Sequence, residues 1–302
     1  MVNSTSNCSK NAMFGSNTSL IVAATFSVIG LPGNILVIIL ILRAKEKKST
    51  TTCQLLNLAI ADIAFLLGRA IATIAAYLTV QCRIKKRKLL LLTIAPKIVA
   101  NIILAMIALE RYNALVKTMK PLLNITRKKI LCSVMIAWIT ALLLCLPPTF
   151  VEPADKFECI HAVLSPLIIT FGYLIPLTIV IFCYSSILKG LYFDGKILAE
   201  KVTDEARLRE KKYLVRGLVV ITLVFLACNL PKIVKIYVYQ CKIHNRSLNI
   251  AFPILEIISS SINPYLYALH SENYRNQVKQ LFCRKKREEN VKLSPAVFDT
   301  KL

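Results

Sequence analysis

Four of the ionisable side chains inside the long apolar stretches of the chain form a candidate site, because a buried charge there can bind or pair. They are Arg69, Lys97, Lys232 and Glu256. A charged side chain in hydrocarbon is costly to bury and marks a candidate functional site. One carboxylate cannot neutralise three cations, so the set predicts a site for a ligand with an acidic group. Such a ligand would be an acidic peptide, a free C-terminal carboxylate, or a small carboxylate or phosphate lipid. The alternative is a structural bridge between Arg69 and Glu256.

Seven apolar segments must position these side chains. The 302 residues are 56% hydrophobic with a mean hydropathy of +0.59, the composition of a membrane protein. A helix needs about 20 apolar residues to cross the hydrocarbon core. Suitable stretches are Leu20–Leu42, Leu55–Val80, Leu89–Leu109, Ile130–Phe150, Ala162–Leu188, Tyr213–Tyr239 and Leu248–Leu269. The predicted fold class is all-α membrane: a seven-transmembrane helix bundle with an uncleaved first helix and a short amphipathic eighth helix at Glu272–Phe282.

Basic residues predict which side of the membrane each segment faces. Most of the 39 lysines and arginines lie in segments that are cytoplasmic if the N-terminus is extracellular. This orientation predicts an extracellular glycosylated segment at 1–19, a membrane domain at 20–270, and a cytoplasmic amphipathic helix and tail at 271–302. The sequons that then face outward are Asn3, Asn7, Asn17 and Asn245. The net charge of +23 indicates inner loops attracted to the lipid membrane, and no nucleic-acid partner is expected.

One basic run breaks this pattern. Arg83–Lys88 lies between the second and third stretches, on the outer side. The run is either an ordinary solvated loop or an electrostatic funnel that steers an acidic ligand inward.

Several features suggest covalent modification or a partner. The cysteines that face the oxidising exterior are Cys8, Cys82, Cys159 and Cys241, and their three possible pairings stay open. Cys283 adjoins basic residues 284–287, which suits palmitoylation, although an unmodified thiol also fits. The ending Thr300-Lys301-Leu302 matches the pattern of a ligand for a PDZ-domain protein.

Short motifs occur in order across all seven stretches. The most telling is Asn263-Pro264-Tyr265-Leu266-Tyr267, because Pro264 lacks an N–H and interrupts the backbone ladder of a membrane helix. The other motif residues are Gly33 and Asn34, Leu58 to Asp62, Glu110 to Tyr112, Trp138, Pro176, Tyr184, Phe225, Cys228 and Pro231. Together they resemble the rhodopsin-like (class A) G-protein-coupled receptors. The stretch Lys48–Leu67 is similar to receptors for galanin- and allatostatin-type neuropeptides.

This resemblance implies a multi-pass plasma-membrane receptor that senses an extracellular ligand and activates heterotrimeric G proteins. In the inactive state Arg111 would pair with Glu110, and on activation it would be released to receive the G protein. The residues that the resemblance assigns to coupling and switching are Glu110, Arg111, Tyr112, Tyr184, Phe225, Pro231, Asn263, Pro264 and Tyr267.

The resemblance also implies an ion pocket at mid-membrane. Similar receptors hold an allosteric sodium ion on the aspartate that Asp62 matches, and Asn34, Ser260 and Asn263 would assist. Ala100 stands where those receptors usually have a serine, so water is the alternative occupant. No other metal and no other cofactor is expected.

Two further positions depart from the family pattern. Asn229 stands where the sixth helix usually has a tryptophan, so the ligand pocket must couple to the bundle differently. Cys82 lies about one helical turn further out than the usual cysteine. The resemblance still favours a Cys82–Cys159 bond, with Cys8 paired to Cys241 as in chemokine-type receptors.

Helical spacing then places the charged residues. Residues seven apart share a helix face; Arg69 lies seven beyond Asp62 and Glu256 seven before Asn263, in helices that run in opposite directions. The resemblance makes Asp62 and Asn263 neighbours, so Arg69 and Glu256 are expected to face each other about 10 Å further out. Lys97 is expected to line the same outer cavity, as is Lys232.

Other functions fit less well. Thr93 replaces the aspartate of amine receptors, and the seventh stretch has no lysine for retinal. The histidines are scattered, so no enzyme is predicted. Two alternatives are retained. One is a constitutively active receptor, suggested by the missing tryptophan, and the other is a membrane transporter, although no internal repeat is found.

Overall fold

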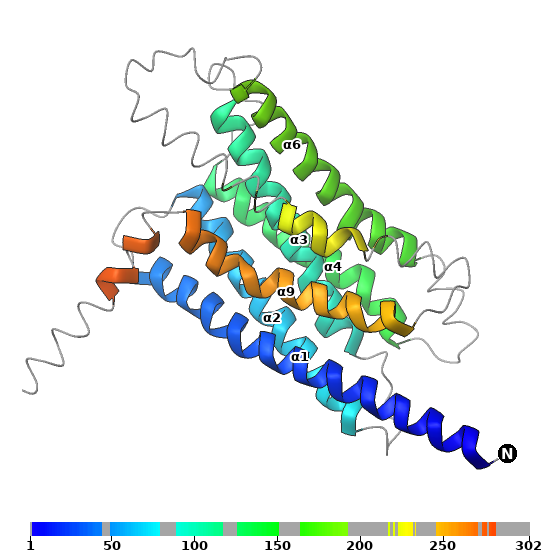
Figure 1. Cartoon of the computed structure of the whole chain (residues 1–302). Coiled ribbons are helices and arrows are strands. Elements are labelled where there is room, and N and C mark those ends of the chain that lie inside the picture. Colours follow the sequence, from blue (N-terminus) through cyan, green and yellow to red (C-terminus); the bar gives the residue numbers. More distant parts are fainter. Residues whose placement is uncertain are drawn as a thin grey trace, which may run out of the picture.

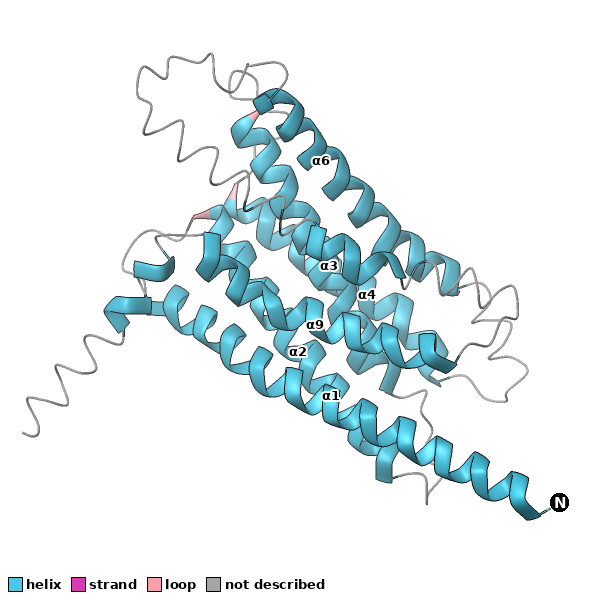
Figure 2. Cartoon of the chain, viewed as in Figure 1, coloured by secondary structure: helices cyan, strands magenta, loops and turns pink. Residues whose placement is uncertain are grey.

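The computed structural model describes the backbone of residues 2–43, 49–78, 89–116, 126–150, 164–192, 217, 220, 223–231, 233, 246–270, 274–276 and 278–281. The side chains of residues 2–20, 23, 76–78, 89–90, 148–150, 191–192, 246–250 and 267–270 are outside this description. Every regular element in the described part of the chain is helical, as predicted (Figure 2).

The helices follow the predicted apolar stretches. They are α1 (Val2–Arg43), α2 (Thr50–Leu78), α3 (Leu89–Leu115), α4 (Arg127–Phe150), the π-helical turn η2 (Thr170–Leu174), α6 (Ile175–Tyr192) and α9 (Arg246–His270). Residues 223–231 are also helical. Within the described ranges, five segments are long and apolar enough to cross a membrane: Ala24–Arg43, Thr50–Ala75, Leu91–Leu115, Arg127–Pro147 and Leu164–Gly190. The predicted all-helical membrane fold is confirmed.

The first helix differs most from its prediction. The sequence predicted a helix from Leu20 onward, after a separate polar segment, whereas α1 begins at Val2. Residues 2–19 contain no proline to end the helix, although the membrane-length apolar part begins only at Ala24. In Figure 1 the N-terminal end of α1 projects beyond the other helices.

Helix α3 is the centre of the bundle. It packs against α2, α4, α6 and η2, while α1 lies beside α2 and α9 (Figure 1). Of the membrane-length apolar part of each helix, 61% is buried in α3, compared with 28% in α4. Polar side chains on α2, α3 and α9 therefore meet in one protein interior, where each must find a partner from a neighbouring helix.

Small residues allow the helices to approach closely. A Cβ atom at Gly68 would collide with the backbone carbonyl of Leu92, so the absence of a side chain there sets the distance between α2 and α3. Gly30 plays the same part between α1 and α9, because a Cβ there would collide with Ser261.

Candidate functional site

The middle of the bundle holds a buried carboxylate with an amide partner. Asn263 Nδ2 of α9 donates a hydrogen bond of 2.7 Å to Asp62 Oδ2 of α2. Asn34 of α1 donates through Nδ2 to the Ser260 carbonyl oxygen at 3.1 Å and to the Gly30 carbonyl oxygen at 3.0 Å. The predicted neighbourhood of Asp62 and Asn263 is confirmed, and α1, α2 and α9 are joined at this level.

Lys97 belongs to this middle level. Its ammonium donates to Ser259 Oγ at 3.1 Å and to Ser260 Oγ at 3.2 Å, and it lies 5.3 Å from the centre of the Phe65 ring. The side chain is only 2% exposed, and its charge interacts with the Asp62 carboxylate. The prediction that Lys97 lines an outer cavity with Arg69 and Glu256 stays a prediction; its two serine partners lie three and four residues after Glu256 in α9.

Arg69 and Glu256 lie together at a second level of the bundle, as the seven-residue spacing predicts, and the predicted orientation makes this the outer level. Their charges are close enough to interact, and Tyr173 interacts with both. The Tyr173 hydroxyl donates a hydrogen bond of 3.2 Å to Glu256 Oε1. Arg69 Nε is buried, and it has no hydrogen-bond partner among the described residues.

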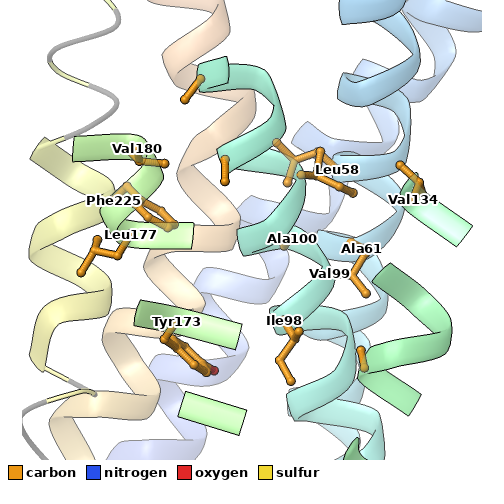
Figure 3. Close-up of a cluster of buried hydrophobic side chains, with 14 of the residues drawn as sticks. Leu58, Ala61, Ile98, Val99, Ala100, Val134, Tyr173, Leu177, Val180 and Phe225 are labelled. Carbon is orange, nitrogen blue, oxygen red and sulfur yellow. The ribbon is translucent and has the colours of Figure 1, made fainter. Parts of the chain in front are cut away.

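The sequence reasoning missed Tyr173 and the turn that carries it. In η2 the helix widens to a π-helical turn, and Asn101 Nδ2 of α3 donates to the Gly172 carbonyl oxygen at 3.0 Å. A Cβ atom at Gly172 would lie only 2.7 Å from Ile98 Cγ1, so this contact requires glycine. Figure 3 shows Tyr173 pointing from this turn in the direction of α3. A lone tyrosine in an apolar stretch gave no signal of this role.

Near the C-terminal end of α3, which the predicted orientation makes the inner end, the Glu110 carboxylate is bound by hydroxyl groups. Thr50 and Thr51, in the first turn of α2, both donate to Glu110 Oε1, Thr51 at 3.1 Å. The expected pair between Glu110 and Arg111 is not formed among the described side chains. Neighbouring residues point about 100° apart on a helix, so Glu110 faces α2. Arg111 instead lies near enough to Tyr184 of α6 for the two to interact.

The other described switch residues pack into the apolar interior. The Tyr112 ring contacts the Phe182 ring at a centroid distance of 5.8 Å. Figure 3 shows Phe225 beside Leu177 and Val180 of α6, and all three are buried. Asn229, at the tryptophan position, donates to the Phe225 carbonyl oxygen at 2.9 Å and is itself buried.

Several predicted site residues lie outside the described residues or have undescribed side chains. They are Lys232, Tyr267, Cys8, Cys82, Cys159, Cys241, Cys283, Asn3, Asn7, Asn17 and Asn245. Their predicted ligand-binding, switching, disulfide, lipidation and glycosylation roles stay predictions. Pro231 and Pro264 are described, and both lie in helical segments.

Comparison with known proteins gives a consistent result. Residues 33–267 match the model of the family described as 7 transmembrane receptor (rhodopsin family). The C-X-C chemokine receptor type 1 of Oryctolagus cuniculus is 28% identical over 297 residues, which cover 85% of this chain and 77% of the relative. The galanin receptor type 1 of Homo sapiens is 28% identical over 302 residues, covering 90% and 84%. The C-C chemokine receptor type 6 of Homo sapiens is 27% identical over 311 residues, covering 89% and 78%.

Proposed function

Because the chain belongs to the rhodopsin family of seven-transmembrane receptors, we propose that it senses an extracellular ligand with an acidic group and activates heterotrimeric G proteins. The family is one of multi-pass membrane receptors rather than of enzymes. Relatives named as chemokine receptors and galanin receptors support a peptide or small protein as the ligand. The extracellular N-terminus inferred from the basic residues would place the Arg69 level nearest to that ligand.

The observation that carries the ligand class is the Arg69 guanidinium. Its Nε is buried without a hydrogen-bond partner in the described part of the chain. Glu256, the nearby carboxylate, also accepts from Tyr173. A guanidinium binds a carboxylate in a paired, charge-assisted geometry, which a ligand carboxylate would complete.

The charge count at this level also supports an acidic ligand. Arg69 and, from the sequence, Lys232 stand against Glu256, so even without Lys97 one positive charge is in excess. One excess charge still favours an anion, and it matches a single acidic group.

The test pairs each candidate ligand with its neutral form. Cells expressing the full chain with a G-protein activation sensor receive acidic peptides, each as the free C-terminal acid and as the amide. A hydrogen bond to a charged group contributes about 1.5–3 kcal/mol, so the acid is expected to be roughly 10- to 100-fold more potent. The variant Arg69→Gln should lose this preference. Lys189→Gln, at an exposed position near the inner end of α6, is the matched control and should keep it. Equal potency of the acid and amide forms of an active peptide would contradict the proposed ligand class.

A second candidate is signalling without ligand. It is supported by Glu110, which is bound to Thr50 and Thr51 rather than to Arg111, and by Asn229 in place of a large aromatic side chain. Basal G-protein activation should then rise in proportion to the receptor density at the cell surface. A basal signal that stays at the level of untransfected cells would exclude this candidate.

A further inference from the structure

The middle level of the bundle contains a cation that belongs to the protein. We propose that the Lys97 ammonium is the permanent counter-ion of Asp62, and that this receptor binds no sodium ion in the pocket where its relatives are expected to hold one. The inference concerns a different site from the proposed ligand pocket and does not depend on the ligand class.

The contacts of Lys97 place its charge in this pocket. Its Nζ donates to the hydroxyl groups of Ser259 and Ser260, and Ser260 also interacts with the Asp62 carboxyl group. Ser260 is fully buried, and Asp62 and Lys97 are 1% and 2% exposed. The ammonium of α3 is therefore coupled to the carboxylate of α2 through a serine of α9, without contact with solvent.

The remaining donor set does not suit a sodium ion. Hard cations need several oxygen ligands arranged around one point. Ala100 offers no side-chain oxygen, and the Ser260 hydroxyl already accepts from Lys97. The amide groups of Asn34 and Asn263 direct their nitrogen atoms to the Ser260 carbonyl and to Asp62. Asp62 Oδ1 is the one carboxylate oxygen in this pocket without a hydrogen-bond partner among the described residues.

Charge balance leads to the same conclusion. Asp62 and Lys97 together are neutral, and a sodium ion added beside them would leave a net positive charge among buried side chains. A buried charge is stable only when it is paired. A tethered ammonium provides that pairing at every external salt concentration, so the pocket is always occupied by a cation of fixed position.

The first test uses the unmodified receptor. The purified full chain in detergent is unfolded by heat in sodium chloride and, at equal ionic strength, in choline chloride. A cation that binds only the folded state raises the unfolding temperature as its concentration rises. We expect identical unfolding temperatures in the two salts. A higher unfolding temperature in sodium chloride would overturn the proposal.

The second test restores an ion site. In the variant Lys97→Met with Ala100→Ser, the ammonium is removed and the missing oxygen is supplied. This variant should become more stable in sodium chloride than in choline chloride, while Ala100→Ser alone should not. A folded double variant that remains indifferent to sodium would show that Lys97 is not what excludes the ion.

The third test measures the coupling of the two charges without any ion. In a double-mutant cycle of Asp62→Asn and Lys97→Met, the loss of stability in the double variant should be clearly smaller than the sum of the single losses. Additive losses would contradict a direct pairing of Lys97 with Asp62.

Discussion

Two levels of the bundle each pair a cation with a carboxylate, and they differ in how the cation is held by its neighbours. Lys97 reaches two serine hydroxyls and interacts with Asp62. Further out, Arg69 retains a buried nitrogen without a hydrogen-bond partner among the described residues, although Glu256 is near. A cation that donates hydrogen bonds to a neighbouring helix holds helices together, while a guanidinium with a donor left over can bind a ligand carboxylate. The two levels should therefore respond differently to the same kind of substitution.

The largest effect is expected at the middle level. Methionine is similar in size to lysine but carries no charge. Replacing Lys97 by Met therefore leaves Asp62 buried without its counter-ion. Breaking a buried pair from one side costs about 3–5 kcal/mol. The unfolding temperature of the purified variant in detergent checks this, with Lys189→Met as the control because Lys189 is exposed. Equal stability of the two variants would mean that Lys97 is not paired inside the bundle.

A smaller loss of stability is expected at the outer level. Arg69→Met removes the attraction to Glu256, but it also removes a guanidinium with an unsatisfied Nε, so the two effects partly cancel. We expect less than half of the loss seen for Lys97→Met, measured in the same unfolding assay. The order of the two variants is the critical result: if Arg69→Met is the more destabilising, the outer level is structural and the Arg69–Glu256 bridge is the correct interpretation.

The Tyr173 hydroxyl is expected to affect how strongly Glu256 pairs with Arg69, because it donates a hydrogen bond to the same carboxylate. The variant Tyr173→Phe removes the hydroxyl that donates to Glu256 Oε1. One such hydrogen bond contributes about 1 kcal/mol. The carboxylate should then turn more fully to Arg69 and compete with a ligand's acidic group, lowering agonist potency roughly five-fold. Concentration–response curves at matched surface expression measure this shift. A potency equal to that of the unmodified receptor would separate Tyr173 from the ligand site.

The contrast between the two levels was only partly predictable from the sequence. The motifs and the seven-residue spacing predicted that Asp62 would meet Asn263 and that Arg69 would approach Glu256, because both depend on backbone periodicity alone. The hydrogen bonds of Lys97 to Ser259 and Ser260 were not predicted, since a flexible side chain on a correctly placed helix has several possible partners. The role of Tyr173 depends on the π-helical turn η2, for which the sequence gives no signal.

The same limit applies to the inner end of α3. The resemblance implied that Glu110 would pair with its neighbour Arg111, but the partners are supplied by the first turn of α2. Consecutive threonines at a helix start look like ordinary capping residues in a sequence. Only the packing of α2 against α3 shows that their hydroxyls face a carboxylate.

The smallest effect is expected for the hydroxyls of Thr50 and Thr51. They bind the Glu110 carboxylate with neutral groups, whereas Asp62 and Glu256 each lie near a cation. Thr51→Val keeps the shape of the side chain and removes one of the two donors to Glu110 Oε1. The loss of about 1 kcal/mol would release Glu110 to turn toward Arg111 and reduce basal G-protein activation roughly five-fold. Thr52→Val is the matched control, because the Thr52 hydroxyl bonds to Ser49 and not to Glu110. Basal activity that is unchanged in Thr51→Val, or lowered equally in both variants, would mean that the threonines do not keep Glu110 from Arg111.

Neutral donors hold a charge less firmly than an ammonium does. This contact should therefore shift the balance between receptor states while leaving the unfolding temperature nearly unchanged, in contrast to Lys97.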